Sequence, residues 1–321
     1  MSITSLLERK ADTSLEDDAA HLRFPGSVMA RFMELRGRRI VKACGAVWYA
    51  VPGRFLMSLP YQRMLNPHRS ELRELIRESG AAGVRFPSTR WTGLESGLYV
   101  LRRRSYDLES VHQKHRPRVR RGLESFQVRP ATKAELVEQG RALNLSTMAR
   151  QGRYDPEFGE KRRWETLVEA AFACSGISVP AAFAGSRLAA YMITCREHRW
   201  LHILCQMSRQ EDLPNFPNHV LTYTVTREAA GDESVDAVCY GYLPLFAADG
   251  LHEYKLRFGY EVVPHQSAFQ LHPTFGTLLT NPVAHATVRL ARAICPGNQN
   301  LETVESIIKG ARSSRPITNP C

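Results

Sequence analysis

Alternation of apolar and polar residues marks strands in the first third of the chain. Residues 38–61 form two runs rich in Val, Trp, Tyr and Phe, joined by the turn dipeptide Pro52-Gly53, which predicts a β-hairpin. Residues 66–80 carry apolar positions at helical spacing, from an Asn-Pro start to a glycine stop, and predict a helix. Together with two further strand patterns, these elements predict a small α/β section over residues 30–105. The two strand patterns are residues 83–86 and 97–101.

The second half of the chain has a longer series of alternating helices and strands. Its first helix begins at Thr132, where Glu135 three residues later completes a capping box. Three consecutive strand patterns with short connections then predict an antiparallel meander. A helix, a strand, a short helix and a last strand follow, so the predicted order over 125–271 is β-α-α-β-β-β-α-β-α-β. The predicted meander strands are residues 177–185, 187–197 and 199–209.

This order predicts where a ligand binds. Two strands joined by a crossover helix run parallel, so the strand ending near Met207 and the strand 235–240 are expected to be parallel neighbours. Ligands bind beyond the carboxyl ends of such strands. Those ends are residues 206–218 and 240–246, and the N-terminus of the crossover helix 219–231 is aimed between them, where its N–H groups favour an anion.

The composition is that of a folded protein. Of the 321 residues, 43% are hydrophobic and 9% aromatic, which excludes a disordered chain and suffices for two domains. The sequence has no apolar run of about eighteen residues or more and no secretory signal pattern, so a cytoplasmic location without a membrane span is expected. Seven cysteines without a C-x-x-C motif indicate reduced thiols.

Signature motifs of several enzyme classes are absent from the sequence. It contains no G-x-S-x-G, H-E-x-x-H, P-loop or dinucleotide-binding pattern, which disfavours a hydrolase, a zinc protease, an NTPase and a dehydrogenase. His112 and His115 are three residues apart, but no carboxylate or cysteine lies in the same helix turn. No metal site is therefore expected.

A short motif near the end of the series resembles a known family. Residues 250–261 read G-L-H-E-Y-K-L-R-F-G-Y-E, with Lys255 on a short helix and Phe258-Gly259 before the last strand. Together with the order of elements, this ending resembles the GNAT acyltransferases, and among them the FemAB-like branch that includes the peptidoglycan-bridge aminoacyl transferases. The run K-H-R-P-R-V-R-R-G-L-E at 114–124 is similar to a basic stretch that precedes the second domain in that branch.

The resemblance implies a fold and a division of the chain. The fold class is α/β with an α+β mixed sheet, in the GNAT-like acyl-CoA N-acyltransferase fold, and the branch doubles this unit. Doubling would make residues 30–105 a degenerate first unit and residues 125–275 the complete acyltransferase domain. The remaining ranges are a flexible lead-in at 1–29, a basic helical linker at 106–124, and C-terminal helices and tail at 276–321.

One departure from the family pattern concerns the acyl donor. GNAT enzymes that use acetyl-CoA carry glycines at the start of the crossover helix, whose N–H groups reach the pyrophosphate. This chain has P-N-F-P-N-H-V at 214–220, without glycine and with two prolines that lack N–H groups. The candidates for binding the donor's anionic part are Asn218, His219 and Arg257. The implied donor is an acyl-CoA or another activated acyl donor that acts as co-substrate, with no tightly bound cofactor.

Two residues are candidates for the chemistry. Acyl transfer to an amine needs a polarised carbonyl and a proton for the leaving group. With the family pattern, Lys255 could stabilise the developing oxyanion or the donor's phosphate, because an ammonium is a strong point charge. Tyr242, where its strand ends, could donate the proton. A solvated helix lysine and a half-buried strand tyrosine are the alternatives.

The substrate-binding candidates come from two places. The loop R-Q-G-R-Y-D at 150–155 follows a helix, and in GNAT-like folds this connection helps to line the acceptor pocket. A solvated helix end is the alternative for this loop, and an ordinary strand tyrosine is the alternative for Tyr240. The candidates are Arg150, Gln151, Arg153, Tyr154 and Tyr240.

The positive charge is concentrated in one segment. The chain carries 43 Lys and Arg against 32 Asp and Glu, a net charge of +11. Between Arg102 and Arg121, eight basic residues stand against Asp107 and Glu109, so 8 − 2 = +6 falls in this stretch. Pro117 is expected to end or kink a helix there. The stretch is either a docking surface for an anionic acyl donor, a site for another polyanion, or a solvated helix face.

These features predict a basic, cytoplasmic N-acyltransferase of the GNAT superfamily, FemAB-like. It would transfer an acyl or aminoacyl group from an acyl-CoA, a carrier protein or an aminoacyl-tRNA to an amine of a small molecule or peptide. A carrier protein or a tRNA would dock at the basic linker. The alternative is a non-catalytic protein that binds RNA or another polyanion through residues 102–121.

Overall fold

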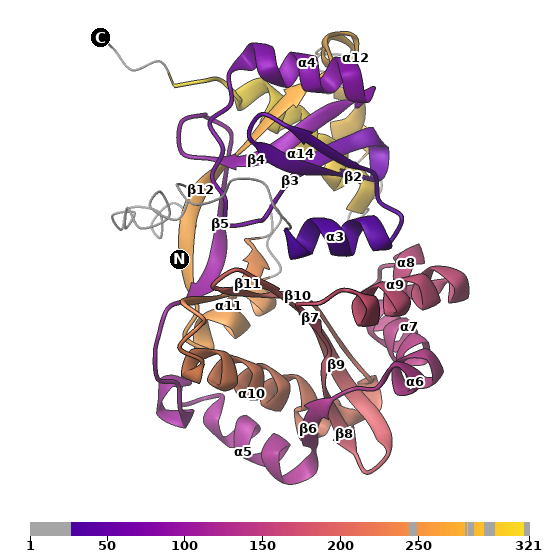
Figure 1. Ribbon diagram of the computed structural model, residues 1–321, viewed down its shortest axis with the longest axis vertical. Helices are drawn as coiled ribbons and strands as arrows, with labels where there is room; N and C mark the ends of the chain where they lie inside the picture. Colours follow the sequence, from indigo (N-terminus) through magenta and orange to yellow (C-terminus); the bar gives the residue numbers. More distant parts are fainter. Residues whose placement is uncertain (1–26, 244–248, 280, 282–285, 292–298, 318–321) are drawn as a thin grey trace. The chain divides into compact units, whose positions relative to one another are not determined.

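The chain is described here by a computed structural model, in which it divides into two compact units (Figure 1). Unit 1 consists of residues 1–98, 242–247 and 262–321, and unit 2 of residues 99–241 and 248–261. The lead-in expected at 1–29 and the first of the two expected tail helices lie mostly or partly outside the described residues. The structure describes residues 27–243, 249–279, 281, 286–291 and 299–317.

Unit 1 is built on a mixed sheet. Its strands are hydrogen-bonded in the order β1-β2-β3-β4-β12-β5. β1, β2 and β3 are antiparallel, β3 and β4 are parallel, and β12 is antiparallel to β4. The strands are β1 (Ile40–Ala43), β2 (Ala46–Val51), β3 (Phe55–Leu59), β4 (Gly83–Ser88), β5 (Leu94–Leu101) and β12 (Glu261–Leu271).

The hairpin predicted from residues 38–61 is confirmed. β2 pairs with β3 from Val47 opposite Leu59 to Val51 opposite Phe55. The turn Pro52–Arg54 contains Gly53 at φ 80°, a backbone conformation that glycine adopts without steric cost.

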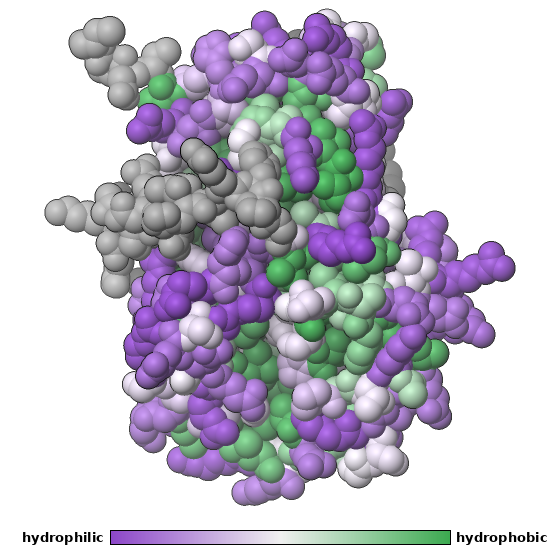
Figure 2. Space-filling model, viewed as in Figure 1, coloured by the Kyte–Doolittle hydropathy of each residue, from purple (hydrophilic) through white to green (hydrophobic). Residues whose placement is uncertain are grey.

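The helix predicted after the hairpin is α4 (Arg69–Ser79), which begins three residues later than expected at the N-terminus. His68 and Glu71 form its capping box, and Gly80 ends it in the left-handed conformation. Its buried Leu72, Leu75 and Ile76 pack in the core with Trp48, Val84 and Phe86. The charged residues between them lie on the outer surface, which is hydrophilic in Figure 2.

Other helices complete unit 1. Phe55, which alternates with the core residue Leu56 along β3, packs with Ile307 and Ala311 of the last helix. In that helix Gly310 lies so close to Phe269 that a Cβ atom would be 2.3 Å from the ring. This helix confirms the second of the two predicted tail helices. The helices are α3 (Val28–Leu35), α12 (Pro273–Leu279) and α14 (Gln299–Ser313).

Unit 2 also has a mixed sheet, with the strand order β5-β11-β10-β9-β8-β6 and β7 paired to β9. The order of its elements along the chain is the one that the sequence predicted, up to the last strand. The Thr132 capping box is confirmed as well. Its further strands are β6 (Gln127–Pro130), β7 (Ile177–Ser178), β8 (Pro180–Ala184), β9 (Arg187–Glu197), β10 (Trp200–Ser208) and β11 (Ala237–Tyr242).

The helices of unit 2 connect these strands. A π-helical turn at Leu136–Gly140 joins α6 and α7. 3-10 turns lie at Leu108–Ser110 and Gln210–Asn215. The helices are α5 (Arg116–Ser125), α6 (Lys133–Glu135), α7 (Arg141–Arg150), α8 (Pro156–Gly159), α9 (Lys161–Ala173), α10 (Pro217–Gly231) and α11 (Asp249–Arg257).

The predicted meander and crossover are confirmed. β8, β9 and β10 are consecutive antiparallel neighbours. After β10 the chain forms α10 and returns as β11, which is parallel to β10. The fold is therefore mixed α/β with a large mixed sheet, as expected.

The effect expected of Pro117 is wrong. α5 begins at Arg116, with Pro117 in its first turn, instead of ending or kinking there. The first N–H groups of a helix have no partner within the helix, so a proline in that turn removes no hydrogen bond. Residues 106–124 thus belong to unit 2, where α5 packs against α10.

The last strand is grouped differently from the range 125–275 drawn on the sequence. β12 pairs with β4 from Gln266 opposite Ser88 to Leu271 opposite Gly83, and from Val262 onward it belongs to unit 1. Its partner lies about 180 positions earlier in the chain, so no local pattern could predict the pairing. Over the described ranges, no helix is long and apolar enough to cross a bilayer.

Candidate functional site

Strands β10 and β11 of unit 2 separate toward their carboxyl ends. They pair only from Trp200 opposite Ala237 to His202 opposite Cys239, although β10 continues to Ser208. A register shift against β9 between Ile203 and Cys205 follows directly after the last pair. The diverging ends leave side chains, instead of backbone hydrogen bonds, to connect the two strands.

A side-chain network spans this divergence. The Tyr240 hydroxyl on β11 donates to Gln206 Oε1 on β10. Gln206 Nε2 donates to the carbonyl oxygen and to Oδ1 of Asn218, both at 3.1 Å. Asn218 lies in the first turn of α10 and donates through Nδ2 to Ser208 Oγ at 3.0 Å. The network thus joins two sequence-predicted residues, Tyr240 and Asn218.

The network continues to a third predicted residue, Arg150 at the end of α7. Its guanidinium donates to Ser208 Oγ at 3.2 Å and approaches the Ser208 carbonyl oxygen at 3.5 Å. Thr147 on the same helix donates to that carbonyl at 2.7 Å. Burial lowers the pKa of Arg150, since its ordinary solvation is reduced, and no ion pair to it is found among the described residues.

Tyr254 of α11 closes the network on the helix side. Its hydroxyl donates to the carbonyl oxygen of Asn218 at 2.9 Å and lies 2.8 Å from Thr222 Oγ1. Burial raises the pKa of Tyr254 well above its usual value. It therefore stays protonated at neutral pH and acts as a hydrogen-bond donor.

Lys255 lies beside this network and is 6% exposed. Its Nζ donates to the carbonyl oxygen of Tyr240 at 2.6 Å and lies 4.2 Å and 4.7 Å from the ring centres of Tyr99 and Tyr240. No ion pair to Lys255 occurs within the described part of the chain. Burial lowers its pKa to about 8, because the charged form loses hydration that the carbonyl and the rings only partly replace.

Tyr99 and His252 form the other side of the lysine site. The Tyr99 hydroxyl and His252 Nδ1 are 2.8 Å apart, which fixes the ring that packs on the ammonium. Burial raises the pKa of Tyr99 to about 12. At neutral pH the ammonium of Lys255 is thus enclosed by neutral groups, and an incoming anion would meet an uncompensated positive charge.

His219 occupies a neighbouring aromatic cluster. Its ring centre is 4.7 Å from that of His115 and 5.1 Å from that of Tyr254, and His219 Nε2 has no hydrogen-bond partner. Burial, with smaller contributions from His115 and Arg118, lowers the pKa of His219 to about 3. Its imidazole is therefore neutral at physiological pH.

The start of α10 lacks a glycine cradle. Phe216, before the helix, has a φ of 61°, and its carbonyl oxygen accepts the N–H groups of His219 at 3.0 Å and Val220 at 3.2 Å. Pro217 has no N–H group. The helix start thus does not fit a pyrophosphate in the manner of the glycine-rich GNAT loops, in agreement with the sequence.

The other predicted residues lie outside the network. Arg153 donates to Gln151 at 2.6 Å on the surface, and Tyr154 is 60% exposed. Arg257 pairs with Glu253 one turn earlier in α11. Tyr242 belongs to unit 1, where its hydroxyl donates to the Tyr61 carbonyl oxygen at 3.3 Å.

Most of the basic stretch engages unit 2 itself. Arg104 pairs with Asp236, Arg116 with Glu109, and Arg121 donates to Asn215. Arg118 lies over the Phe216 ring at 5.6 Å and Arg102 over the Trp200 ring at 5.3 Å. These contacts leave Arg103, Lys114 and Arg120 as the basic side chains of the stretch without a hydrogen bond, ion pair or ring contact in the described residues.

Sequence reasoning missed several side chains of the site, and four of them show why. Gln206, Tyr99, His252 and Tyr254 were not among its candidates. Gln206 had a signal, since it is a polar residue that follows the apolar run 203–205 at the predicted ligand-binding end of the strand. The other three had none, because ordinary helices and strands carry tyrosines and histidines at similar positions.

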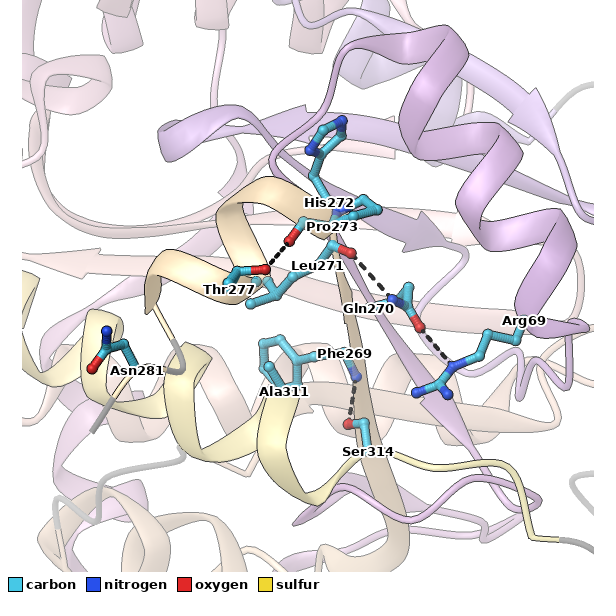
Figure 3. A pocket seen from close by; sticks show the side chains of 11 residues that line it. Arg69, Phe269, Gln270, Leu271, His272, Pro273, Thr277, Asn281, Ala311 and Ser314 are labelled. Carbon is cyan, nitrogen blue, oxygen red and sulfur yellow. Dashed lines mark hydrogen bonds between the residues drawn. The ribbon is translucent and has the colours of Figure 1, made fainter. Parts of the chain in front are cut away.

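Two hollows lie elsewhere. One, of about 530 Å³, is in unit 1, and Figure 3 shows Arg69 Nε donating to Gln270 Oε1 at 3.3 Å on its wall. The other hollow, of about 290 Å³, is in unit 2. Its lining includes Arg196 near the end of β9, and Glu228 and Asp232 at the end of α10. In the first, Arg69 is exposed and the hollow lacks the convergent buried polar groups of the Lys255 site.

Comparison with known proteins places the fold. No family model matches the sequence, and no curated protein matches it either. Among solved structures, FemX is similar with a TM-score of 0.52 and 12% identity, over 78% of this chain and 92% of FemX. A C-terminal domain assigned to a lysylphosphatidylglycerol synthetase of Agrobacterium fabrum is similar with a TM-score of 0.53 and 11% identity, over 89% of this chain and 96% of that domain.

The chain therefore has a GNAT-like fold, of the mixed α/β kind found in FemX. This is the fold that the resemblance to the GNAT acyltransferases and their FemAB-like branch implied. At this level of identity, the similarity establishes the fold alone. Any argument about function therefore rests on the geometry of the site.

Proposed function

We propose that the protein is an N-acyltransferase that moves an acyl or aminoacyl group from an activated donor to an amine, at the diverging ends of β10 and β11. The observation that carries this proposal is Lys255, a buried lysine with a pKa of about 8 and no counter-ion among the described residues. A buried cation of this kind stabilises negative charge that develops on a neighbouring atom during the reaction.

The chemistry required of the site is simple. The acceptor amine attacks the donor carbonyl, a C–N bond forms, and the C–S or C–O bond to the leaving group breaks while the amine's proton passes to that leaving group. Lys255 Nζ gives one hydrogen bond to the Tyr240 carbonyl oxygen and has two further N–H groups for the oxyanion. With a pKa of about 8, most of the lysine is charged at pH 7.

The remaining predicted residues have proposed roles around this centre. Asn218 and Tyr240 are held by Gln206 and would orient the donor and the acceptor, and Arg150 would pair with an anionic group of either. The roles predicted for five further residues remain proposals, because no contact between them and this network is found among the described residues. These residues are Tyr242, Arg257, Gln151, Arg153 and Tyr154.

The donor is proposed to be an aminoacyl ester or a carrier-bound acyl group before a free acyl-CoA. Two features support this order: the start of α10 has no glycine cradle, and one of the similar structures is a domain of a putative lysylphosphatidylglycerol synthetase, whose name includes an amino acid. An acyl-CoA is still included among the donors to be tested.

A donor panel tests the proposal. The full chain is incubated with acetyl-CoA, decanoyl-CoA, an acylated carrier protein, or alanyl- and lysyl-tRNA, each with a lysine-containing peptide as the amine. We expect amine-dependent consumption of at least one donor, lost in Lys255→Met and kept in Lys161→Met, an exposed lysine on α9. If no donor is consumed, or if both variants behave alike, the proposal is wrong.

A further inference from the structure

One face of the unit 1 sheet carries a buried polar cluster. Along β4, Val84 and Phe86 point into the core under α4, so Arg85 between them points to the opposite face. In the register with β12, Arg85 lies opposite Phe269. A charged side chain thus stands in the central part of a sheet, between two paired neighbours.

Arg85 is held in place without a negative partner. Its Nε donates to Ser267 Oγ at 2.8 Å, and its guanidinium carbon lies 5.8 Å and 5.6 Å from the ring centres of Tyr242 and Phe269. No carboxylate pairs with it, and its two terminal nitrogens form no hydrogen bond, as far as the described residues extend. Burial lowers the pKa of Arg85, since a guanidinium in these surroundings lacks hydration.

His265 lies beside this arginine on β12, two positions before Ser267. It is 6% exposed, and neither of its ring nitrogens has a hydrogen-bond partner. Its ring centre is 5.7 Å from that of Tyr242. Burial and then the charge of Arg85 lower the pKa of His265 to about 3, against a smaller opposing effect of the Val263 backbone, which lies near the ring but outside hydrogen-bond geometry. The ring is therefore neutral and offers one N–H donor.

Tyr242 forms a wall of the cluster. Its hydroxyl is engaged by the Tyr61 carbonyl oxygen at 3.3 Å, and the two tyrosine rings are 5.2 Å apart. The ring of Tyr242 is therefore fixed between Arg85 and His265. The cluster combines an uncompensated cation, an unused neutral donor and flat aromatic surfaces.

A half-buried guanidinium without a counter-ion and a buried imidazole without a hydrogen-bond partner are both unfavourable, and a ligand that supplies acceptor oxygens would stabilise both. We propose that unit 1 contains a binding site for a small-molecule carboxylate, bound in bidentate form by Arg85 between Tyr242 and Phe269, with a hydrogen bond from His265. This site is independent of the acyl transfer proposed for unit 2.

The geometry favours a carboxylate over a phosphate. With Nε taken by Ser267, the guanidinium keeps a pair of terminal nitrogens for two parallel hydrogen bonds, which match the two oxygens of a carboxylate. A carboxylate also carries one negative charge, which one guanidinium neutralises. A phosphate dianion would keep an unpaired charge in a poorly hydrated place.

Calorimetric titration of the full chain in low-chloride buffer tests this site. Benzoate is the probe, benzamide is the uncharged probe of the same shape, and inorganic phosphate is the competing anion. The variants are Arg85→Met, which removes the charge, and Ser267→Ala, which frees Nε. The control is Arg69→Met, because Arg69 also has its Nε bonded to a β12 side chain but lines the other hollow of unit 1 (Figure 3).

We expect wild type and Arg69→Met to bind benzoate with equal affinity and not to bind benzamide. Arg85→Met should bind benzoate at least about tenfold more weakly than wild type, and Ser267→Ala should show an intermediate loss of benzoate affinity. We also expect the thermal midpoint of Arg85→Met without ligand to equal or exceed that of wild type, since an unpaired buried charge is removed.

Four results would each overturn the proposal. They are no benzoate binding to wild type at about 10 mM, equal binding by Arg85→Met, loss of binding in Arg69→Met instead, and tighter binding of phosphate than of benzoate. A clearly lowered midpoint of Arg85→Met would also overturn it, because Arg85 would then serve the fold.

Discussion

At the scale of single residues, the site depends on a lysine that the fold keeps out of water. Lys255 is close to the Tyr240 carbonyl oxygen and to two tyrosine rings, and these partners replace only part of its hydration. Keeping it charged therefore opposes folding at neutral pH. A substrate that develops negative charge next to it would recover that energy, which is why its burial indicates function.

The titration of Lys255 gives a first prediction. Its pKa in the folded chain is about 8, against 10.5 for the free side chain, so the unfolded chain binds more protons between these pH values. The free energy of unfolding should therefore rise with pH across this window, by about 3 kcal/mol from this group. Urea unfolding at pH 7.5 and 10.5 measures the rise, and the difference between wild type and Lys255→Met isolates it.

Lys161→Met is the control for that series, because Lys161 is exposed on α9. Its pH dependence should equal that of wild type. An equal rise in Lys255→Met and wild type would show that the lysine titrates normally.

Gln206 gives a second prediction. It accepts from Tyr240 and donates to Asn218, so Gln206→Leu leaves the buried Tyr240 hydroxyl without its acceptor and the Asn218 side-chain oxygen without this donor. We expect a loss of about 1–3 kcal/mol in the free energy of unfolding. Gln113→Leu, at an exposed position, should change it little, and denaturant curves of the two variants should therefore differ in midpoint.

At the scale of elements, the helices α5 and α10 meet closely at Gly122. A Cβ atom there would lie 2.8 Å from Val220 Cβ and 3.1 Å from the Phe216 carbonyl oxygen, which caps the start of α10. Gly122→Ala should thus lower stability by about 1–3 kcal/mol, although alanine favours helices. At Gly231 a Cβ atom meets nothing within 4 Å, so Gly231→Ala should be neutral or stabilising. Equal thermal midpoints of the two variants would contradict the close contact.

Elements with a local signal were predictable from the sequence. The hairpin around Pro52-Gly53, the Thr132 capping box and the meander each depend on neighbouring residues. Pro117 was misread because proline is unfavourable within a helix but acceptable in its first turn, and no clear N-cap residue precedes it in the sequence.

The same division applies to the site. Asn218 and Tyr240 lie at the ends of predicted elements, so the strand order could identify them, and the family resemblance identified Lys255 on its short helix. Gln206 on β10 reaches Tyr240 on β11 only because of how far the two strands diverge. The burial of His219 depends on its packing with α5 and α11. Neither leaves a pattern along the chain.

At the scale of the whole molecule, the charge of +11 is less available than the sequence implied. Of the eight basic residues at 102–121, five have partners within unit 2, and Arg103, Lys114 and Arg120 have none in the described residues. We expect binding of uncharged tRNA to fall with salt along a log–log slope of about −2, instead of the value near −6 that eight free charges would give. Filter binding between about 50 and 200 mM salt measures this slope. A slope of about −5 or steeper would favour the polyanion-binding alternative.

The most direct measurement is the single-turnover rate of acyl transfer by wild type, Lys255→Met and Lys255→Arg, with the donor that the panel identifies. If Lys255 stabilises the oxyanion, the rate should fall by about 10²–10³ in Lys255→Met with donor affinity nearly unchanged. Lys255→Arg should restore part of the rate, since the charge returns in a different shape. Full activity of Lys255→Met would contradict an acyl-transfer site at the ends of β10 and β11.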